Sequence, residues 1–415
     1  MHSRTVARFK QWFWQPPRPH GAILHDRVVT NLELFYDLVY VAVIGQAAGR
    51  LAEDVTNQRI LEFAIVFAMV WLAWLNGTLY LEIHGRQDGR TRSFVFVQMG
   101  ILVLLAVFTA GAAAETGAAF AITYAALLAV MTWLWQSVRG RDDESYRAIT
   151  AVYVIAMLAS IAVVLVSAVL PPAGRLLAWA ALSIAWVVAF FVLGRHPTFA
   201  TSVGPTDSMV ERFGLFAIIV LGEVIIGVVD GMSHTNTDAL TVLTGLLALG
   251  IGFGFWWTYF DIVGRRMPRP DGLAIVTWMT TQLPITMAIA GAGAAMVSLI
   301  EHAHDPAAPA PTALLLAGTV ALGLVCLVLN AWSLEDARRL PNVYRPVSAV
   351  MLVGAVVALG IGIALPAAWV LGLLLDLLLS VLWVVVVGLF LREGAWSEAQ
   401  ELDEGEATPE SSPAG

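Results

Sequence analysis

The sequence predicts an all-α protein: a polytopic membrane bundle of about twelve transmembrane helices, arranged as two parallel six-helix repeats. Hydrophobic residues make up 59% of the 415 positions and charged residues only 13%, whereas soluble domains average about 25% charged residues. Long stretches carry no charge at all, among them 94–114, 273–300 and 347–375. Each exceeds the roughly 20 apolar residues that cross a bilayer as a helix with its own backbone groups paired.

Twelve apolar stretches follow one another along the chain. Charged residues, proline or glycine separate them, which is typical of loops between spans. We expect the spans, in chain order, at 31–49, 60–83, 94–113, 118–138, 149–169, 176–194, 211–229, 239–260, 273–300, 311–333, 347–365 and 368–391.

The connection between the sixth and seventh spans divides the chain. It contains His196-Pro197 and Gly204-Pro205, which disfavour helix. We therefore expect two membrane repeats, a cytoplasmic linker between them and a cytoplasmic segment at each end. The five parts, in chain order, are 1–30, 31–194, 195–210, 211–391 and 392–415.

The two ends of the chain differ in character. Segment 1–30 mixes Arg and Lys with Trp and Phe, which indicates an amphipathic stretch on an anionic leaflet, with a disordered tail as the alternative. After Arg392 the chain has seven acids and no base, so this tail accounts for most of the net charge of −8. The tail is expected to be disordered, and nothing in the charge pattern indicates nucleic-acid binding.

The distribution of basic residues predicts the orientation in the membrane. If the N-terminus is cytoplasmic, 20 of the 23 Lys and Arg residues fall on the cytoplasmic side, and only Arg50, Arg59 and Arg175 lie outside. Cytoplasmic loops carry such an excess. We expect a multi-pass protein of the cell (plasma) membrane with both termini in the cytoplasm.

The two halves resemble each other. Six spans in each half give both copies one orientation, so the repeats would be parallel, about an axis along the membrane normal. Chance similarity among tryptophan-rich membrane helices is the alternative. The matched positions are Glu33-Leu34-Phe35 with Glu211-Arg212-Phe213, Gly45-Gln46 with Gly222-Glu223, Trp71, Trp74 and Asn76 with Trp256, Tyr259 and Asp261, and Gln98 with Gln282.

Acidic residues inside the spans are the candidate ion or proton path. An ionisable group at the centre of a span costs about 2.5–3.5 kcal/mol on insertion scales and usually faces the bundle interior. Glu33 and Asp37 lie four residues apart, so they share one face of the first helix. The helix dipole alone could account for Glu33. Asp376 stands alone among leucines and is the weaker candidate.

Glu223 is the deepest of these acids. It lies twelve residues beyond Glu211, about 18 Å into the seventh span. Because no Arg or Lys is expected in any span core, a protonatable site is favoured over a fixed salt bridge, with a helix–helix hydrogen bond as the alternative. Asp37 and Glu223 would then line one path between the halves, as successive steps of a proton or cation relay. Glu82 and Asp261, at span ends, are expected to be interfacial.

Several chemistries lack their sequence signatures. There is no His-Glu-x-x-His zinc motif, no Gly-x-Ser-x-Gly elbow and no phosphate-binding loop. A single cysteine, Cys326, excludes an intrachain disulfide. We expect no catalytic residues, no metal and no cofactor, and a protein that is not an enzyme.

Three segments resemble the bacterial low temperature requirement A family: 31–41, 211–223 and 256–261. The similarity covers roughly residues 25 to 390. Members often have a histidine where this chain has Ser208, so no role of that histidine is carried over. The resemblance implies a multispanning bacterial inner-membrane protein linked by name to growth in the cold, without an established activity. The polar and aromatic residues that match the family pattern are Gln46, Glu211, Arg212, Trp256, Tyr259 and Asp261.

Three functions are consistent with these features. An acid-only interior favours a transporter or channel for protons or cations, with the bilayer and the ion as partners. A non-transporting sensor or scaffold in cold or stress adaptation is the second hypothesis. A membrane enzyme acting on lipid is the third, because Glu33, Asp37, Glu211 and Arg212 would gather at the cytoplasmic leaflet.

Overall fold

The computed structural model describes residues 13, 15, 17, 18, 27–86, 88–140, 142, 144–196, 199–202 and 204–392. Twelve of its helices are long and apolar enough to cross a membrane, which confirms the predicted fold class. They are α2 (Asn31–Ala52), α3 (Asn57–His84), α4 (Gly89–Thr109), α5 (Gly117–Val138), α6 (Glu144–Ser167), α7 (Pro172–Gly194), α9 (Asp207–Ser233), α10 (Ala239–Ile262), α11 (Gly272–Glu301), α12 (Ala310–Ala331), α14 (Pro341–Ile363) and α15 (Ala368–Arg392).

Two short helices lie in the connections, α8 (Phe199–Ser202) and α13 (Glu335–Arg339). The predicted acidic tail after Arg392 and most of the predicted amphipathic segment 1–30 fall outside the described residues.

Polar residues begin several of the helices. Thr30 and Glu33 form a reciprocal capping box at the start of α2: the Glu33 amide donates to the Thr30 hydroxyl at 3.3 Å, and the Thr30 amide donates to the Glu33 carboxylate at 3.1 Å. This pairs two backbone N–H groups that a helix start otherwise leaves free. At the starts of α3, α4 and α10 a single side chain caps the helix by accepting hydrogen bonds from backbone N–H groups of the first turn. These capping residues are Thr56, Asp88 and Asp238.

The seventh span begins earlier than the sequence suggested. α9 starts at Asp207 rather than at 211, because Thr206 follows Gly204-Pro205 and its hydroxyl accepts the Met209 amide at 3.1 Å. The predicted linker 195–210 is therefore shorter, and it contains α8. The extra turn places Arg212 inside the helix, and this has a direct consequence for the candidate site.

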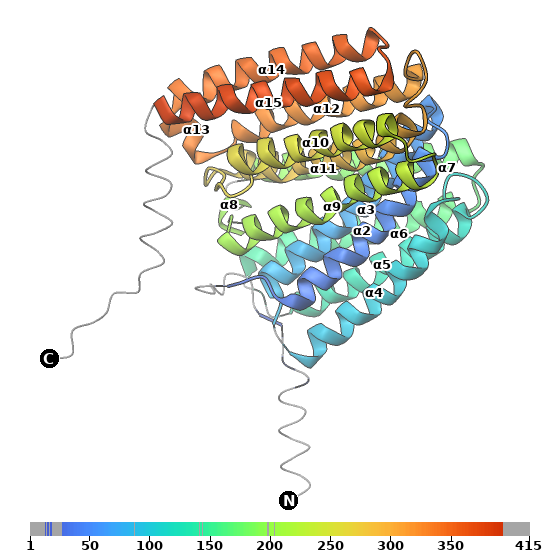
Figure 1. Cartoon of the computed structure of the whole chain (residues 1–415). Helices are drawn as coiled ribbons and strands as arrows, with labels where there is room; N and C mark the ends of the chain where they lie inside the picture. The colour runs from blue at the N-terminus through green and yellow to red at the C-terminus, as the bar shows by residue number, and fades with distance from the viewer. Residues whose placement is uncertain are drawn as a thin grey trace, which may run out of the picture.

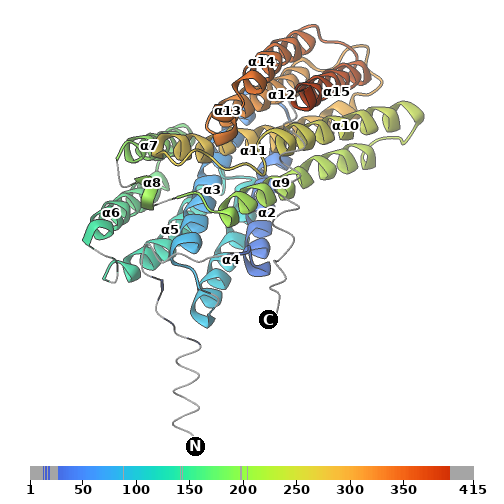
Figure 2. The same cartoon turned by 90° about the vertical axis from the view of Figure 1, so that its left-hand side faces the viewer.

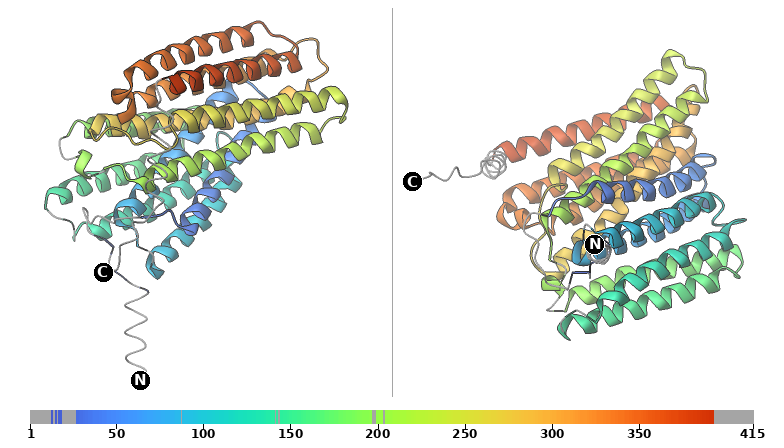
Figure 3. Two further views of the ribbon diagram at one scale, coloured as in Figure 1. Left: turned by 60° about the vertical axis from the view of Figure 1, so that its left-hand side comes forward. Right: turned by 90° about the horizontal axis from the view of Figure 1, so that it is seen from below.

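The helices of the two halves pack in the same pattern. The first half, from blue to green, and the second half, from yellow to red, occupy opposite sides of the molecule (Figures 1 and 3). If α2 to α7 are matched in order with α9, α10, α11, α12, α14 and α15, each of the seven closely packed pairs of spanning helices in the first half has a counterpart in the second. The two halves therefore share one order of helix packing, while the repeat and its axis stay predictions.

Contacts between the halves do not follow a two-fold axis. α11 packs on α2, α3 and α7, whereas α4, its counterpart, makes no comparably close contact with α9, α10 or α15 in the described part of the chain. In the second view α11 lies between the helices of the first half and α10 (Figure 2). The two halves therefore meet through different surfaces, and the contact of α2 with α9 is one part of that interface.

Candidate functional site

The first helices of the two halves, α2 and α9, run side by side from the same end of the bundle. We call their contact the α2–α9 seam and define it by Asp37 and Gly45 on α2 and by Arg212 and Glu223 on α9. Asp37 and Arg212 lie nearer the starts of their helices, and Gly45 and Glu223 lie farther along them. Asp37 and Gly45 are eight residues apart, or about 12 Å along the axis, so the seam has two separate polar levels.

The first level is a buried ion pair. The Asp37 carboxylate accepts hydrogen bonds from Arg212 Nη2 at 2.9 Å and from Arg212 Nε at 3.3 Å. The Trp74 indole Nε1 on α3 donates to the same carboxylate at 2.8 Å. Both charged residues are fully buried, at 0% exposure. Two parallel N–H···O bonds fix the mutual orientation of the two side chains as well as their separation.

This pair contradicts two expectations from the sequence. Arg212 was expected outside the span core, and the interior was expected to contain acids only. The earlier start of α9 instead puts Arg212 in its second turn, facing α2. Asp37 therefore has a basic partner. The predicted relay between Asp37 and Glu223 assumed that neither acid has one, and this assumption is wrong for Asp37.

Aromatic rings surround the pair. Trp74 stacks on Phe216 with ring centroids 4.0 Å apart and meets Phe213 edge-on at 5.1 Å. Phe213 also contacts Trp278 of α11 at 4.8 Å. These rings exclude water, which strengthens the attraction between the two charges and raises the cost of separating them. Arg212 Nη1 is buried without a hydrogen-bond partner among the described residues.

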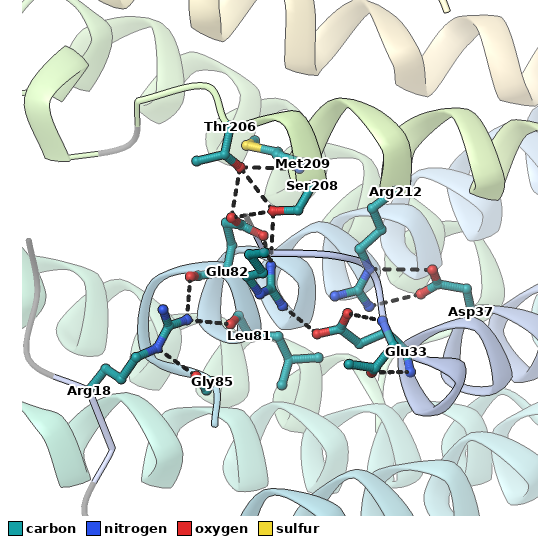
Figure 4. Close-up of polar contacts among 12 residues, drawn as sticks. Arg18, Glu33, Asp37, Leu81, Glu82, Gly85, Thr206, Ser208, Met209 and Arg212 are labelled. Atoms are coloured by element: carbon teal, nitrogen blue, oxygen red, sulfur yellow. Dashed lines mark hydrogen bonds and ion pairs between the residues drawn. The ribbon is translucent and has the colours of Figure 1, made fainter. Parts of the chain in front are cut away.

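A second ion cluster lies beside the first, at the end of the bundle where α2 and α9 begin (Figure 4). The Arg27 guanidinium contacts the carboxylates of both Glu33 and Glu82. Glu82, on the last turn of α3, also accepts hydrogen bonds from the hydroxyls of Thr206 at 2.7 Å and Ser208 at 2.8 Å. Burial lowers the pKa of Arg27, and the nearby Glu33 counteracts part of that effect.

The sequence did not identify Arg27 or Glu82 as members of this cluster. Glu82 was expected to be interfacial because it stands at a span end, and only the approach of α9 reveals its partners. Ser208 donates to Glu82 and accepts from Arg27 at 3.4 Å. Ser208 therefore lies within the cluster.

Arg18, from the N-terminal segment, closes the end of α3. Its guanidinium donates to the carbonyl oxygens of Gly85 at 2.6 Å and Glu82 at 2.8 Å. A cation at a helix C-terminus satisfies free carbonyl groups and complements the helix dipole. Burial lowers the pKa of Arg18. This contact places Arg18 at the same end of the bundle as the ion cluster (Figure 4).

The second level of the seam is Glu223. It lies 16 residues from the start of α9 and 10 from its end, about 24 Å and 15 Å along the helix, and it is 8% exposed. Its carboxylate lies against Gly45 of α2: a Cβ added there would stand 2.9 Å from Oε1 and 3.1 Å from Oε2. Among the described residues Glu223 has no hydrogen-bond or ion-pair partner.

The remaining predicted residues lie away from the seam. Asp376, on α15, is half-buried against Gly250 of α10, and α15 packs chiefly on α10 and α14. Gln46 and Glu211 are exposed on the outer faces of their helices. The seam thus brings together Asp37, Arg212 and Glu223, with Glu33 beside them, and not Asp376.

The family-pattern residues of α10 make contacts within the second half. The Tyr259 hydroxyl donates to the Gln282 side-chain oxygen on α11 at 3.1 Å, and the Trp383 indole on α15 donates to Asp261 at 2.7 Å. Trp256 stacks against Phe253, with ring centroids 5.6 Å apart. The two hydrogen bonds tie α10 to α11 and α15, the ring contact lies within α10, and none of the three reaches the seam.

Comparison with known proteins identifies a family that matches most of the chain. A model of the family described as bacterial low temperature requirement A protein matches residues 28–389. An uncharacterized protein of Rhizobium meliloti (strain 1021) is 25% identical over 247 residues, which are 55% of this chain and 57% of that protein. The chain thus covers less than two thirds of this relative. No solved structure matches.

Proposed function

This chain belongs to the bacterial low temperature requirement A family, and we propose that it carries protons or small cations across the plasma membrane along the α2–α9 seam. Glu223 supports this proposal most strongly. An ionisable residue in a membrane span is costly and is found mostly where it faces a pathway or a partner. Glu223 faces the other half of the molecule and has no partner among the described residues.

The surroundings of Glu223 suit an exchangeable site. Gly45 leaves room for the carboxyl group, and no guanidinium or ammonium group forms an ion pair with it within the described residues. A carboxyl in such a place can hold a proton or, when ionised, a small cation, and it can exchange one for the other. Carboxylate oxygens are suitable ligands for small hard cations.

The ion pair of Asp37 and Arg212 has a different role in this proposal. The two charges neutralise each other, so Asp37 does not carry the ion itself. The pair and the Arg27 cluster instead hold the α2 and α9 starts together at one end of the seam, which we assign to the cytoplasmic side. Opening that end requires the separation of buried charges, so these pairs would act as a gate.

Ion flux into proteoliposomes tests the proposal directly. The purified chain is reconstituted, and internal pH and cation uptake are followed under imposed gradients of H⁺, Na⁺ and K⁺. We expect flux of at least one of these ions above that of protein-free vesicles, and a dependence on external pH. If no gradient of any of them produces flux, the chain is not a transporter of this class, and a sensor, a scaffold or a lipid enzyme would take its place.

A further inference from the structure

A long groove runs between α9 and α10 on the outer surface of the bundle. It consists of two hollows. The hollow nearer the start of α9 has a volume of about 390 Å³ and the next one about 490 Å³. Ile218 of the first hollow and Leu221 of the second are three residues apart on α9, and Phe260 and Trp256 are four apart on α10. The two hollows therefore follow one another along the same pair of helices, α9 and α10, which run side by side in Figure 1.

Glycines line this groove and allow α9 and α10 to approach each other closely. Gly214 and Gly264 line the first hollow, and Gly250 and Gly252 line the second. At Gly252 a Cβ would stand 2.5 Å from a methyl group of Val224 on α9. The two helices therefore touch at the back of the groove.

The groove walls are apolar and face outward. Ile218 is 46% exposed, Ile225 56% and Phe253 50%. In a bilayer this face meets hydrocarbon, and an apolar hollow of such size would not stay empty. The volume lies within the range of about 300–1,000 Å³ that is typical of small-molecule sites. A lipid acyl chain has the shape and the polarity to fill it.

One end of the groove carries charge. Asp207 and Glu211 are exposed one turn apart at the start of α9, and Arg265 follows the end of α10; all three line the first hollow. None of them forms an ion pair within the described part of the chain. Two like charges at i and i+4 repel each other, so a cation between them relieves that repulsion. The Arg265 guanidinium presents donors that suit a phosphate.

We propose that this groove binds one phosphatidylethanolamine molecule. Its acyl chain fills the apolar hollows, its primary ammonium group lies between Asp207 and Glu211, and its phosphate lies at Arg265. The arrangement of two acids and one base matches a headgroup that carries one positive and one negative charge, and it would repel a purely anionic headgroup. This site is independent of the seam and of any ion that the seam carries.

Native mass spectrometry of the full chain in detergent tests this assignment. The delipidated protein is titrated with phosphatidylethanolamine, phosphatidylcholine or phosphatidylglycerol of the same chain length. We expect phosphatidylethanolamine to be retained about fivefold more than the other two. Its ammonium group is positively charged and donates hydrogen bonds to both carboxylates, whereas the choline group has no N–H donor and phosphatidylglycerol has no positive charge. The double variant Asp207→Asn/Glu211→Gln should lose this preference. The control Glu335→Gln, which removes a carboxylate from α13, should keep it.

A second pair of variants tests the acyl-chain position. Ile218→Trp puts a large ring into the first hollow and should abolish retention of all three lipids. Ile226→Trp adds the same ring to an equally exposed position of α9 that does not line the groove, and it should retain phosphatidylethanolamine as wild type does. Equal retention of the three lipids by the wild-type chain, or an unchanged preference in the double variant, would overturn the proposal.

Discussion

The guanidinium group of Arg212 on α9 donates two hydrogen bonds to the carboxylate of Asp37 on α2, and neither residue is exposed. This contact joins the first helix of one half to the first helix of the other. It is charged, oriented and enclosed by aromatic rings, so it fixes the register between the halves at one end of the seam. The carboxyl of Glu223 lies deeper in that same seam, where none of the described basic residues forms an ion pair with it.

Removal of either member of the ion pair should destabilise the protein strongly. Asp37→Asn leaves the Arg212 charge buried without a counter-charge, and such a change costs about 3–5 kcal/mol. Thermal unfolding in detergent measures the loss. The control Glu53→Gln breaks a surface pair with Arg50 and should cost less than about 1 kcal/mol. In a double-mutant cycle Asp37→Asn/Arg212→Gln should cost less than the sum of the single changes, and additivity would show that the residues do not interact.

The indole donor to Asp37 should be detectable separately from ring packing. Trp74→Phe retains most of the ring but removes the N–H group that donates to the carboxylate. A hydrogen bond to a charged group contributes about 1.5–3 kcal/mol. Trp71→Phe is the matched control, because the buried Trp71 Nε1 has no hydrogen-bond partner in the described part of the chain. We expect a larger fall in melting temperature for Trp74→Phe, and equal falls would contradict the assignment.

Gly45 should be required for function and not for folding in general. In Gly45→Ala the added methyl group would stand within about 3 Å of both Glu223 carboxylate oxygens, so that carboxyl must move. We expect reduced ion flux at normal expression. Gly49→Ala changes the same helix one turn later, where nothing lies within 4 Å of the new Cβ, and it should transport as wild type does. Equal flux in the two variants would contradict the contact.

The spans were predictable because a bilayer requires long apolar helices, and loop composition fixed their number. The exact residues at which the helices start were harder to predict. The capping residue Thr206 adds a turn to α9, and Arg212, expected at the boundary of the linker, lies in the seam as a result. Glu223 could be selected because it stands alone in an apolar run. Its partner surface at Gly45 could not, since that contact depends on how two helices rotate against each other.

The Arg27 cluster, which contains Glu33 and Glu82, shows a related limit of prediction from sequence patterns. Its members come from the residues before α2, from the start of α2, from the end of α3 and from the start of α9. Each one alone has an ordinary explanation as a residue near a membrane interface. Only the packing of the helices reveals that Arg27 lies between the carboxylates of Glu33 and Glu82, so the spacing of these residues along the chain carried no signal.

The orientation of the bundle can be tested by cysteine labelling in a Cys326→Ala background. The loop after α9 and the α13 segment lie at opposite ends of the helices. A membrane-impermeant maleimide should label Thr235→Cys in intact cells and should label Arg339→Cys only after the membrane is permeabilised. Labelling of Arg339→Cys from outside, with Thr235→Cys protected, would reverse the predicted topology, which places the gate at the cytoplasmic end.

The pH dependence of flux in the Glu223→Gln variant tests the central claim most directly. Glutamine preserves the size and the neutral form of the side chain but cannot exchange a proton or hold a cation by charge. Proteoliposomes with wild type, Glu223→Gln and the control Asp376→Asn, which changes a membrane acid outside the seam, are compared over a range of external pH. We predict normal insertion of all three and loss of pH-dependent flux in Glu223→Gln alone. Unchanged pH-dependent flux in Glu223→Gln would contradict the account.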